Sequence, residues 1–244
     1  MKQTVSVIGF GNFGKFLVKH LILSNIDVFV TDIIDKNNEA RELGASFVSL
    51  EKALQSKIII IAVPMEKFIE TLINIKNELK KDTIIIDVCS LKMFSCDAMI
   101  RILPKNVQII GSHPLFGPQS ARNSIEGMKI ALINVRTNKK TFEKIKKFCE
   151  TLKLRVIITT PEIHDKEMAV SQALTHFIGM VFNRLGIKRI ELSTKTFEDL
   201  MNIVDIVKND TPALFNNMQQ INPFAKKIRE DFIKNVNSLD YELN

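Results

Sequence analysis

Short apolar runs alternate with amphipathic stretches along the first 160 residues of the 244-residue chain. Apolar residues recur at helical spacing between most of these runs, for example from Asn12 to Ser24. One run, KIIIIAVP, is apolar without interruption, which is typical of a strand buried on both faces of a parallel sheet. The predicted strands are TVSVIGF, DVFVTD, KIIIIAVP, TIIIDV, VQIIGS, MKIALINV and LRVIITT. Their alternation with helices predicts an α/β fold, a doubly wound parallel sheet with helices on both faces.

This alternation stops near Pro161, and the pattern beyond it is helical. Residues 164–185 carry apolar side chains almost all round the predicted helix, which indicates burial on more than one side. Two further helical stretches are predicted at 196–208 and 212–236. We therefore predict a sheet domain over residues 1–160 and an all-helical domain over residues 161–244. Because the helical domain is small to stand alone, we expect it to pack on the sheet domain and on a second chain, forming a homodimer.

Composition narrows the class of protein. With 45% hydrophobic and 25% charged residues the chain is typical of a soluble globular protein, and no apolar run is long enough to cross a bilayer. Three cysteines without metal-ligand spacing, and a chain that enters a strand at once, predict a cytoplasmic protein without a metal site.

The net charge of +7 raises the question of a nucleic-acid partner. The densest basic run, NKKTFEKIKKFCE, has apolar residues at helical spacing, so it predicts an amphipathic helix with a solvated basic face. There is no Trp and a single Tyr, so no basic surface interleaved with aromatic residues is available to stack on bases. We expect no nucleic-acid partner, and a positive balance suits anionic small molecules equally well.

A glycine motif opens the first predicted helix. The sequence GFGNFG places Gly9, Gly11 and Gly14 directly after a strand, and Asp32 ends the next strand eighteen residues after Gly14. In this context the G-x-G-x-x-G motif predicts a Rossmann-type dinucleotide site. The first glycine permits a tight turn, the second lets a pyrophosphate approach the backbone, and the third lets helix and strand pack closely.

The carboxylate of Asp32 predicts the choice of cofactor. At the end of the second strand it would accept hydrogen bonds from the ribose hydroxyls and repel a 2′-phosphate, so we predict NAD in preference to NADP. A role as a helix N-cap is the alternative for Asp32, and the nearby cations Lys36 and Arg41 weigh against strict discrimination. The other residues assigned to the cofactor site are Asn12, Phe13, Val63 and Ser90.

Two later strands deliver reactive side chains to one edge of the predicted sheet. The segment DVCSLK brings Ser90 and Lys92 to the carboxyl end of one strand, and VQIIGSHPLFGP brings His113 to the end of the next. Ligands bind at this edge in such sheets. An imidazole beside a hydroxyl suits the oxidation of an alcohol, because histidine can accept the hydroxyl proton as hydride leaves. The alternative for His113 is a purely structural role, fixing the turn.

The segments DVCSLK, GSHPLFGPQSA and HDKEMAVSQALTHFIG resemble motifs of the prephenate and arogenate dehydrogenases, in the same order. The resemblance runs from Gly9 to about Ala225. It implies a Rossmann domain followed by a helical dimerisation domain. It also implies oxidation of a cyclohexadienol at C4 with NAD or NADP, with loss of the ring carboxylate as CO2. Prephenate would give 4-hydroxyphenylpyruvate, and arogenate would give tyrosine.

The resemblance also implies roles for individual residues. His113 and Ser90 would be catalytic and would bind the substrate 4-hydroxyl. Gln172 and His176, four residues apart on one helix face, would lie on the substrate side, although a histidine satisfied within the helical core is an equal alternative for His176. His164 with Asp165 is interpreted as a helix start.

One departure from the family bears on the substrate. Prephenate-specific members commonly use an arginine of the helical domain to bind the side-chain carboxylate, and residues 193–225 contain none. A zwitterionic side chain needs less positive charge, so arogenate is favoured and prephenate comes second, with Lys195 or Lys208 as possible cations. Two other functions remain open: another NAD(P)-dependent β-hydroxyacid or imine reductase, and a non-catalytic NAD-sensing dimer.

Overall fold

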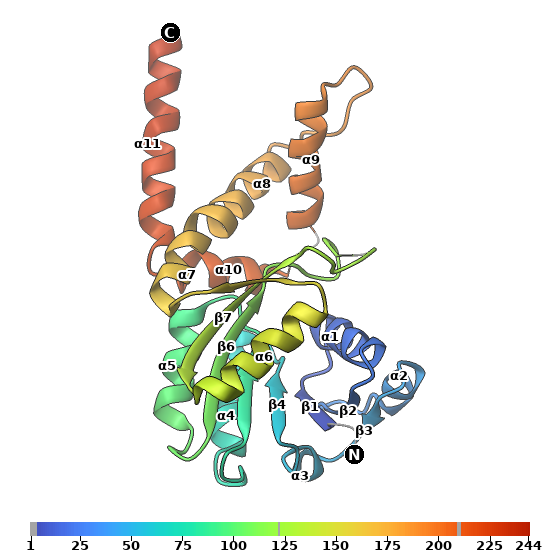
Figure 1. Ribbon diagram of the computed structural model, residues 1–244. Coiled ribbons are helices and arrows are strands. Elements are labelled where there is room, and N and C mark those ends of the chain that lie inside the picture. Colours follow the sequence, from blue (N-terminus) through green and yellow to red (C-terminus); the bar gives the residue numbers. More distant parts are fainter. Residues whose placement is uncertain (1–3, 122, 209–210) are drawn as a thin grey trace. The chain divides into compact units, whose positions relative to one another are not determined.

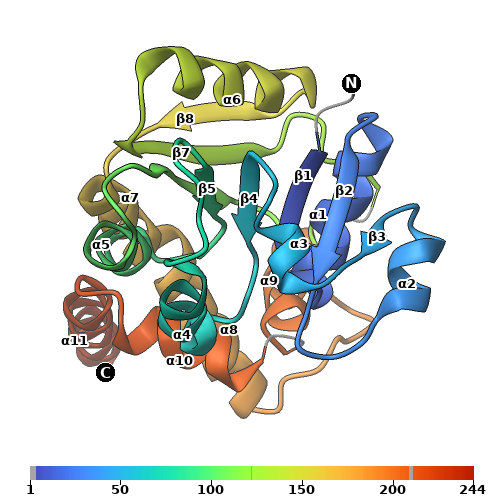
Figure 2. The same cartoon turned by 90° about the horizontal axis from the view of Figure 1, so that it is seen from below.

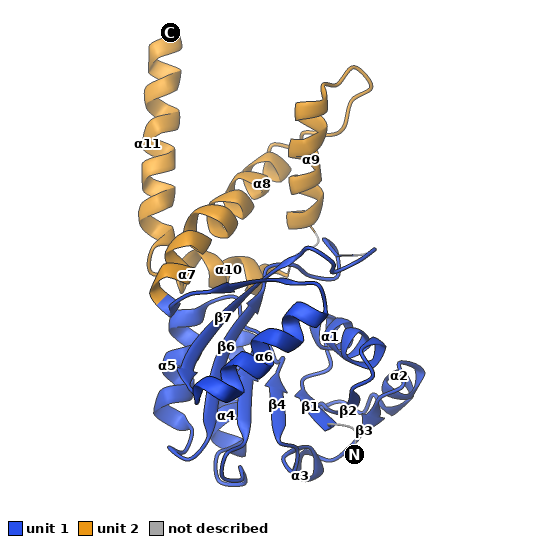
Figure 3. Ribbon diagram, viewed as in Figure 1, with its two compact units in different colours: residues 1–161 blue, residues 162–244 orange. Residues whose placement is uncertain are grey.

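The computed structural model describes residues 4–121, 123–208 and 211–244 (Figure 1). The chain divides into two compact units, residues 1–161 and residues 162–244, which Figure 3 shows in separate colours.

The first unit is built on an eight-stranded sheet with the order β3-β2-β1-β4-β5-β6-β7-β8. All neighbouring strands are parallel except β6 and β7, which pair antiparallel. The strands are β1 (Thr4–Ile8), β2 (Asp27–Thr31), β3 (Ser46–Phe47), β4 (Ile58–Ile61), β5 (Ile84–Asp87), β6 (Gln108–Pro114), β7 (Lys129–Arg136) and β8 (Arg155–Ile158). The predicted doubly wound sheet is therefore confirmed, with one reversed strand and one short additional strand, β3.

The direction of β7 follows from the segment that precedes it. A parallel neighbour needs a crossover connection, which is usually a helix. The described residues between Pro114 and Lys129 form turns and no helix, so the chain reverses and β7 returns beside β6. The apolar pattern predicted this strand but carries no information about its direction.

Helices cover both faces of the sheet (Figure 2). Alternate residues of each strand point to opposite faces, so Ile58 and Ile60 join the core beneath α1 and α6, and Ile59 and Ile61 join the core beneath α4 and α5. The helices of this unit are α1 (Asn12–Leu23), α2 (Asn37–Glu42), α3 (Leu50–Ala53), α4 (Met65–Ile75), α5 (Lys92–Ile102) and α6 (Lys139–Thr151).

The described residues of the second unit form helices only. They are α7 (Pro161–Met168), the π-helical segment η1 (Ala169–Leu174), α8 (Thr175–Arg184), α9 (Lys195–Lys208), α10 (Pro212–Gln220) and α11 (Ala225–Leu243). None of the described helices is long and apolar enough to cross a membrane.

Two details of this unit differ from the prediction. The helix expected over 164–185 contains a π-helical turn, and the stretch expected over 212–236 is two helices. The break falls at Asn222–Pro223, because proline lacks the N–H that a continuing helix requires. The Asn222 side chain completes the break: its oxygen accepts from the Phe224 amide (3.0 Å), and its nitrogen donates to the Asp165 carbonyl (2.8 Å).

Candidate active site

The glycine motif forms the turn between β1 and α1. Gly9 has a φ of +100°, and a Cβ there would lie 2.6 Å from the Ala62 carbonyl oxygen. A Cβ on Gly14 would lie 2.1 Å from the Gly9 carbonyl oxygen, so neither position admits a side chain. Gly11 differs, because a Cβ there would meet no atom within 4 Å. The backbone at Gly11 is therefore open to an approaching ligand.

The amides of the first turn of α1 suit a phosphate group. The first hydrogen bond at this end of the helix runs from the Lys15 amide to the Gly11 carbonyl (2.9 Å), so the amides of Asn12, Phe13 and Gly14 precede it. No side chain caps this end of the helix. Free N–H groups and the positive end of the helix dipole make a site for an anion, here for a pyrophosphate.

Asp32 follows the last residue of β2, as predicted, and it contacts the glycine turn. Its Oδ2 accepts from the Phe10 amide (2.6 Å) and from Lys36 Nζ (3.2 Å), and its Oδ1 accepts from the Ile34 amide (3.1 Å). Burial raises the pKa of Asp32, but the hydrogen bonds from Phe10, Ile34 and Lys36 together lower it by more than burial raises it. The pKa of Asp32 therefore lies below its ordinary value. The carboxylate is therefore ionised at neutral pH.

Two features of this end of the site were not apparent from the sequence. Lys36 Nζ donates to the Phe10 carbonyl (3.0 Å) as well as to Asp32, so it is part of the turn. Ile33 is 96% exposed directly after Asp32, an apolar side chain beside a site for a nucleotide. The sequence carried one sign of this exposure: Ile33 follows Asp32, after the end of β2, so it is not part of the buried strand.

The carboxyl ends of β5 and β6 lie side by side, with Asp87 opposite Gly111. Ser90 follows β5 by three residues and is partly exposed. His113 is the sixth residue of β6, opposite Ala131 of β7, and is buried. His113 lies at the carboxyl end of the strand, as predicted, but the predicted strand ended at Ser112, whereas β6 continues through Pro114 because β7 supplies a partner. Both side chains thus lie at the same edge of the sheet.

A buried ion pair joins the ends of these strands. Lys92 Nζ donates to the Asp87 carboxylate and to the Ser112 carbonyl (2.6 Å), and both charged side chains are completely buried. Ser112 returns two bonds to Asp87, from its hydroxyl to the Asp87 carbonyl (2.5 Å) and from its amide to Oδ1 (3.3 Å). The residue before His113 is therefore fixed to β5 and to the start of α5. The sequence placed Lys92 at the rim of the site, whereas it lies in the core.

Gly111 makes this close packing possible. A Cβ at this position would lie 2.8 Å from Cys96 Sγ of α5 and 3.7 Å from Asp87 Oδ1. The glycine before Ser112 and His113 is thus needed for the approach of α5, and not for turn geometry.

In the second unit, Gln172 lies in the π-helical segment and His176 in the first turn of α8. Gln172 Oε1 is buried and accepts no hydrogen bond from the described residues. Single π-helical turns are frequent at functional sites. Lys195 pairs with Asp199, and Lys208 is exposed at the end of α9.

The residues interpreted as a helix start are placed differently. Helix α7 begins at Pro161, so His164 and Asp165 follow its first residues. Both side chains are buried, and His164 Nδ1 lies 2.7 Å from Asp165 Oδ1. The pair is therefore part of the packing of this unit, and not an exposed cap.

The cysteines contribute no nucleophile to this site. Burial, followed by the charge of Asp87, raises the pKa of the Cys89 thiol, and burial raises the pKa of Cys149 to about 12. All three cysteines are buried thiols. Within the described ranges, no group of His, Cys, Asp and Glu residues has the arrangement of a metal site.

The fold and the glycine turn define a dinucleotide-binding protein of the Rossmann class. A family model described as "Prephenate dehydrogenase, nucleotide-binding domain" matches residues 22–158, more than half of the chain. The chain therefore belongs to the prephenate dehydrogenase family. A second model, described as "TYRAAT1-like, C-terminal domain", matches residues 181–244.

Proteins that are similar to this chain over most of its length are named as arogenate or prephenate dehydrogenases. Arogenate dehydrogenase 2 of Arabidopsis thaliana is 29% identical over 91% of this chain and 64% of its own length. The probable arogenate/prephenate dehydrogenase of Methanocaldococcus jannaschii is 28% identical over 94% of this chain and 54% of its own. This chain thus spans between about half and two-thirds of these relatives.

Solved structures support the same fold. The crystal structure of Aquifex aeolicus prephenate dehydrogenase with hydroxyphenyl propionate and NAD+ aligns with a TM-score of 0.80 at 23% identity, covering 100% of this chain and 91% of the other. Synechocystis arogenate dehydrogenase aligns with a TM-score of 0.76 at 17% identity, covering 99% and 92%.

Proposed function

We propose that the protein is an NAD-dependent dehydrogenase that oxidises and decarboxylates a cyclohexadienol, with arogenate favoured and prephenate second. The observation that carries the proposal is the position of His113, fixed at the end of β6 beside the end of β5 that bears Ser90. Membership of the prephenate dehydrogenase family and the names of the relatives support the same reaction.

The residues present fit a dinucleotide. Gly11 leaves open the space beside the first amides of α1, which would bind the pyrophosphate. Asp32 would accept hydrogen bonds from the ribose hydroxyls, because a carboxylate has more acceptor positions than its three present donors use. Phe13 lies in the first turn of α1, and the backbone of Val63 lies beside Gly9. Ile33 would lie against the adenine. When bound there, NAD supplies the acceptor for a hydride.

In the proposed reaction, the imidazole of His113 accepts the proton of the substrate 4-hydroxyl while the hydride leaves C4. The C4–O bond becomes a carbonyl. The bond between the ring and its carboxylate then breaks, CO2 leaves, and its electron pair enters the ring. Protonation of the C4 oxygen completes the aromatic phenol. Ser90 would donate a hydrogen bond to the same oxygen and hold the hydroxyl toward His113.

Gln172 and His176 are proposed to bind the substrate side chain. The buried Gln172 Oε1, without a partner among the described residues, supports this role, because a buried acceptor is costly unless a donor such as a substrate ammonium group satisfies it. An ammonium group is present in arogenate and absent in prephenate. Together with the lack of arginine in residues 193–225, this supports arogenate.

We also propose a cytoplasmic homodimer formed through the helical unit. Exposed apolar side chains on α11, including Val236, Leu239 and Leu243, support the dimer. The three free thiols support a reducing compartment.

The test of His113 is the variant His113→Ala. We expect NADH binding to change little and kcat with arogenate to fall by roughly 10²–10⁴, the usual contribution of a general base. Fluorescence titration of NADH and steady-state kinetics measure the two effects. A variant that turns over at a near-normal rate would remove His113 from the mechanism.

A further inference from the structure

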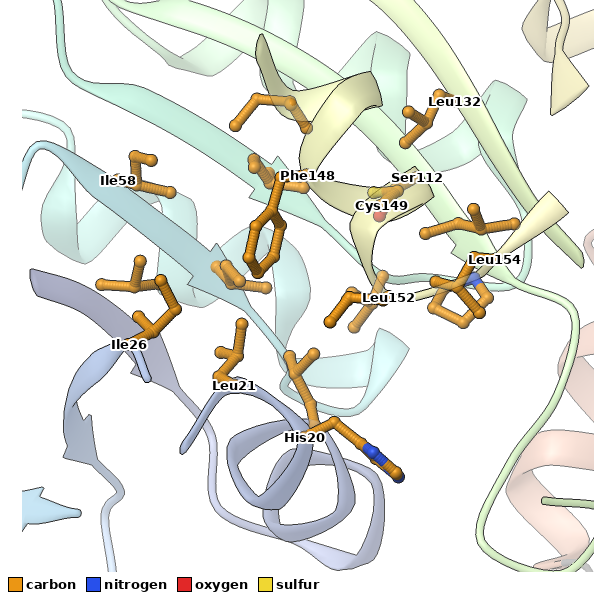
Figure 4. A pocket seen from close by; sticks show the side chains of 18 of the residues that line it. His20, Leu21, Ile26, Ile58, Ser112, Leu132, Phe148, Cys149, Leu152 and Leu154 are labelled. Carbon is orange, nitrogen blue, oxygen red and sulfur yellow. The ribbon is translucent and has the colours of Figure 1, made fainter. Parts of the chain in front are cut away.

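A cavity of about 350 Å³ lies within the first unit, between the sheet and the helices α1 and α6. Figure 4 shows side chains of α1, α6 and the sheet around it, among them Leu21, Phe148 and Ile58. The cavity begins behind the glycine turn: Phe13 of the motif lines it, but neither Gly9 nor Gly11 does. Its size and its largely apolar lining are those of a small-molecule site.

The two faces of the sheet differ in how completely they are covered. Beneath α4 and α5, Ile59, Ile61 and Ile85 are 0% exposed. On the opposite face the neighbouring residues of the same strands remain 6–8% exposed: Ile58, Ile60, Ile84 and Ile86. These four isoleucines line the cavity. Protein cores are normally packed without such spaces, so the empty volume is specific to this face.

The lining of the cavity extends both across the sheet, from Val5 of β1 to Leu132 of β7, and along the strands. On β6 it reaches from Gln108 to Pro114, about 20 Å of strand at about 3.3 Å per residue. Lys57 precedes β4 at the end where β6 begins, because Ile58 pairs with Ile84 and Ile84 pairs with Gln108. Helix α6 starts at this end too, since Thr137 and Asn138 donate to the Gln108 side chain.

The charged residues that line the cavity are basic. Lys57 lies at this end and Lys144 lies in the middle of α6, and no acidic residue is among the lining residues. Neither ammonium group has an ion-pair partner among the described residues. His20 also lines the cavity. Burial, followed by the charge of Lys19, lowers the pKa of His20, so its ring is neutral at neutral pH. The charge available to a ligand is therefore that of the two lysines.

We propose that this cavity binds a medium-chain aliphatic carboxylate, such as decanoate. The carboxylate lies between the ammonium groups of Lys57 and Lys144, and the hydrocarbon chain lies over the isoleucines of β4 and β5. An aliphatic chain fits the largely apolar lining of the cavity. At its far end the cavity is lined by Ser112 and Pro114, the two neighbours of His113, so a bound chain contacts the segment that carries the proposed base.

The test is isothermal titration calorimetry of the full chain with hexanoate, octanoate and decanoate. We expect saturable binding of one carboxylate per chain, with the dissociation constant falling about three- to fourfold for each added methylene group. Octan-1-ol, which lacks the charge, should bind at least about tenfold more weakly than octanoate. No saturable heat with any of the three carboxylates would overturn the proposal.

Variants separate this site from unspecific binding. The double variant Lys57→Met/Lys144→Met changes only exposed side chains, and we expect its affinity for decanoate to fall at least about tenfold. The matched control is Lys147→Met, an exposed lysine of α6 that does not line the cavity, and its affinity should equal that of the unmodified chain. Equal decanoate affinity in the double variant and the control would overturn the assignment.

A cavity-filling variant gives an independent measurement. Ile60→Phe adds volume inside the cavity, so decanoate affinity should fall while NADH affinity is retained. Retained NADH affinity also shows that the variant is folded. Unchanged decanoate affinity in this folded variant would place the carboxylate elsewhere.

Discussion

At the scale of single residues, the site depends on charges that compensate one another. Asp32 supports discrimination against NADP only if its charge is uncompensated, yet Lys36 Nζ lies 3.2 Å from Oδ2. A 2′-phosphate near this carboxylate would also approach an ammonium group. We therefore predict a preference for NAD with incomplete exclusion of NADP, and we expect Lys36 to set the extent of that exclusion.

The variant Lys36→Met tests this interpretation. Removing the cation leaves the Asp32 carboxylate to repel a 2′-phosphate, so kcat/KM with NADP should fall at least about tenfold, or ~1.4 kcal/mol, and with NAD by less than about threefold. Steady-state kinetics with both cofactors measure the ratio. Lys147→Met serves as the charge-matched control. An equal loss with both cofactors would show that Lys36 only maintains the turn.

At the scale of elements, the ends of β5 and β6 and the start of α5 are joined through Asp87 and Lys92. A buried ion pair contributes little net stability compared with an apolar pair, but the loss of one partner leaves a buried charge. The pair therefore fixes the arrangement of three elements next to His113.

Lys92→Met should reduce the free energy of unfolding by about 3–5 kcal/mol, because Asp87 remains buried without its cation. The double variant Asp87→Asn/Lys92→Met should recover part of this loss. Urea denaturation of the single and double variants measures both values. A single variant that loses less than about 1 kcal/mol would show that water reaches Asp87.

Helix α11 carries an apolar stripe at Phe232, Val236, Leu239 and Leu243, and the last three are exposed. Spacings of four, three and four residues place them on one side of the helix. A stripe of this kind is typical of helix–helix association.

The variant Val236→Glu/Leu239→Glu should convert the proposed dimer to a monomer, because it places two charges in the apolar stripe. Light scattering after size-exclusion chromatography measures the mass. The control Asn235→Glu/Asn237→Glu adds the same charge beside the stripe and should remain dimeric. A dimer that survives the first variant would place the interface elsewhere.

Apolar periodicity predicted most of these elements, but not their details. It placed the strands from β4 to β8 and the helix α6, because burial imposes a regular pattern on them. It could not give the direction of β7, which depends on the connection before it. It also missed the π-helical segment, because the sequence AVSQAL is ordinary for an α-helix. It predicted one helix over 212–236, although the chain breaks at Asn222–Pro223.

The same limit applies to the site. The spacing of the glycines located the dinucleotide turn, and the segment GSHPLFGP at the end of a predicted strand located His113, because both are local features of the sequence. The burial of Lys92, the contact of Lys36 with Phe10 and the cavity beneath α6 arise from tertiary packing. No local pattern reports these features.

As a whole molecule, the chain combines a dinucleotide-binding unit with a helical unit that would supply substrate contacts and a dimer interface. Family membership and the fold define the first unit. The proposed reaction uses residues of both units.

The most direct test is the reaction itself. The purified chain is mixed with NAD and either arogenate or prephenate, and NADH and CO2 are measured together. We expect equal amounts of NADH and CO2, with a higher kcat/KM for arogenate. Absence of NADH formation with both substrates, despite binding of NAD, would exclude the proposed reaction and favour a nucleotide-sensing protein.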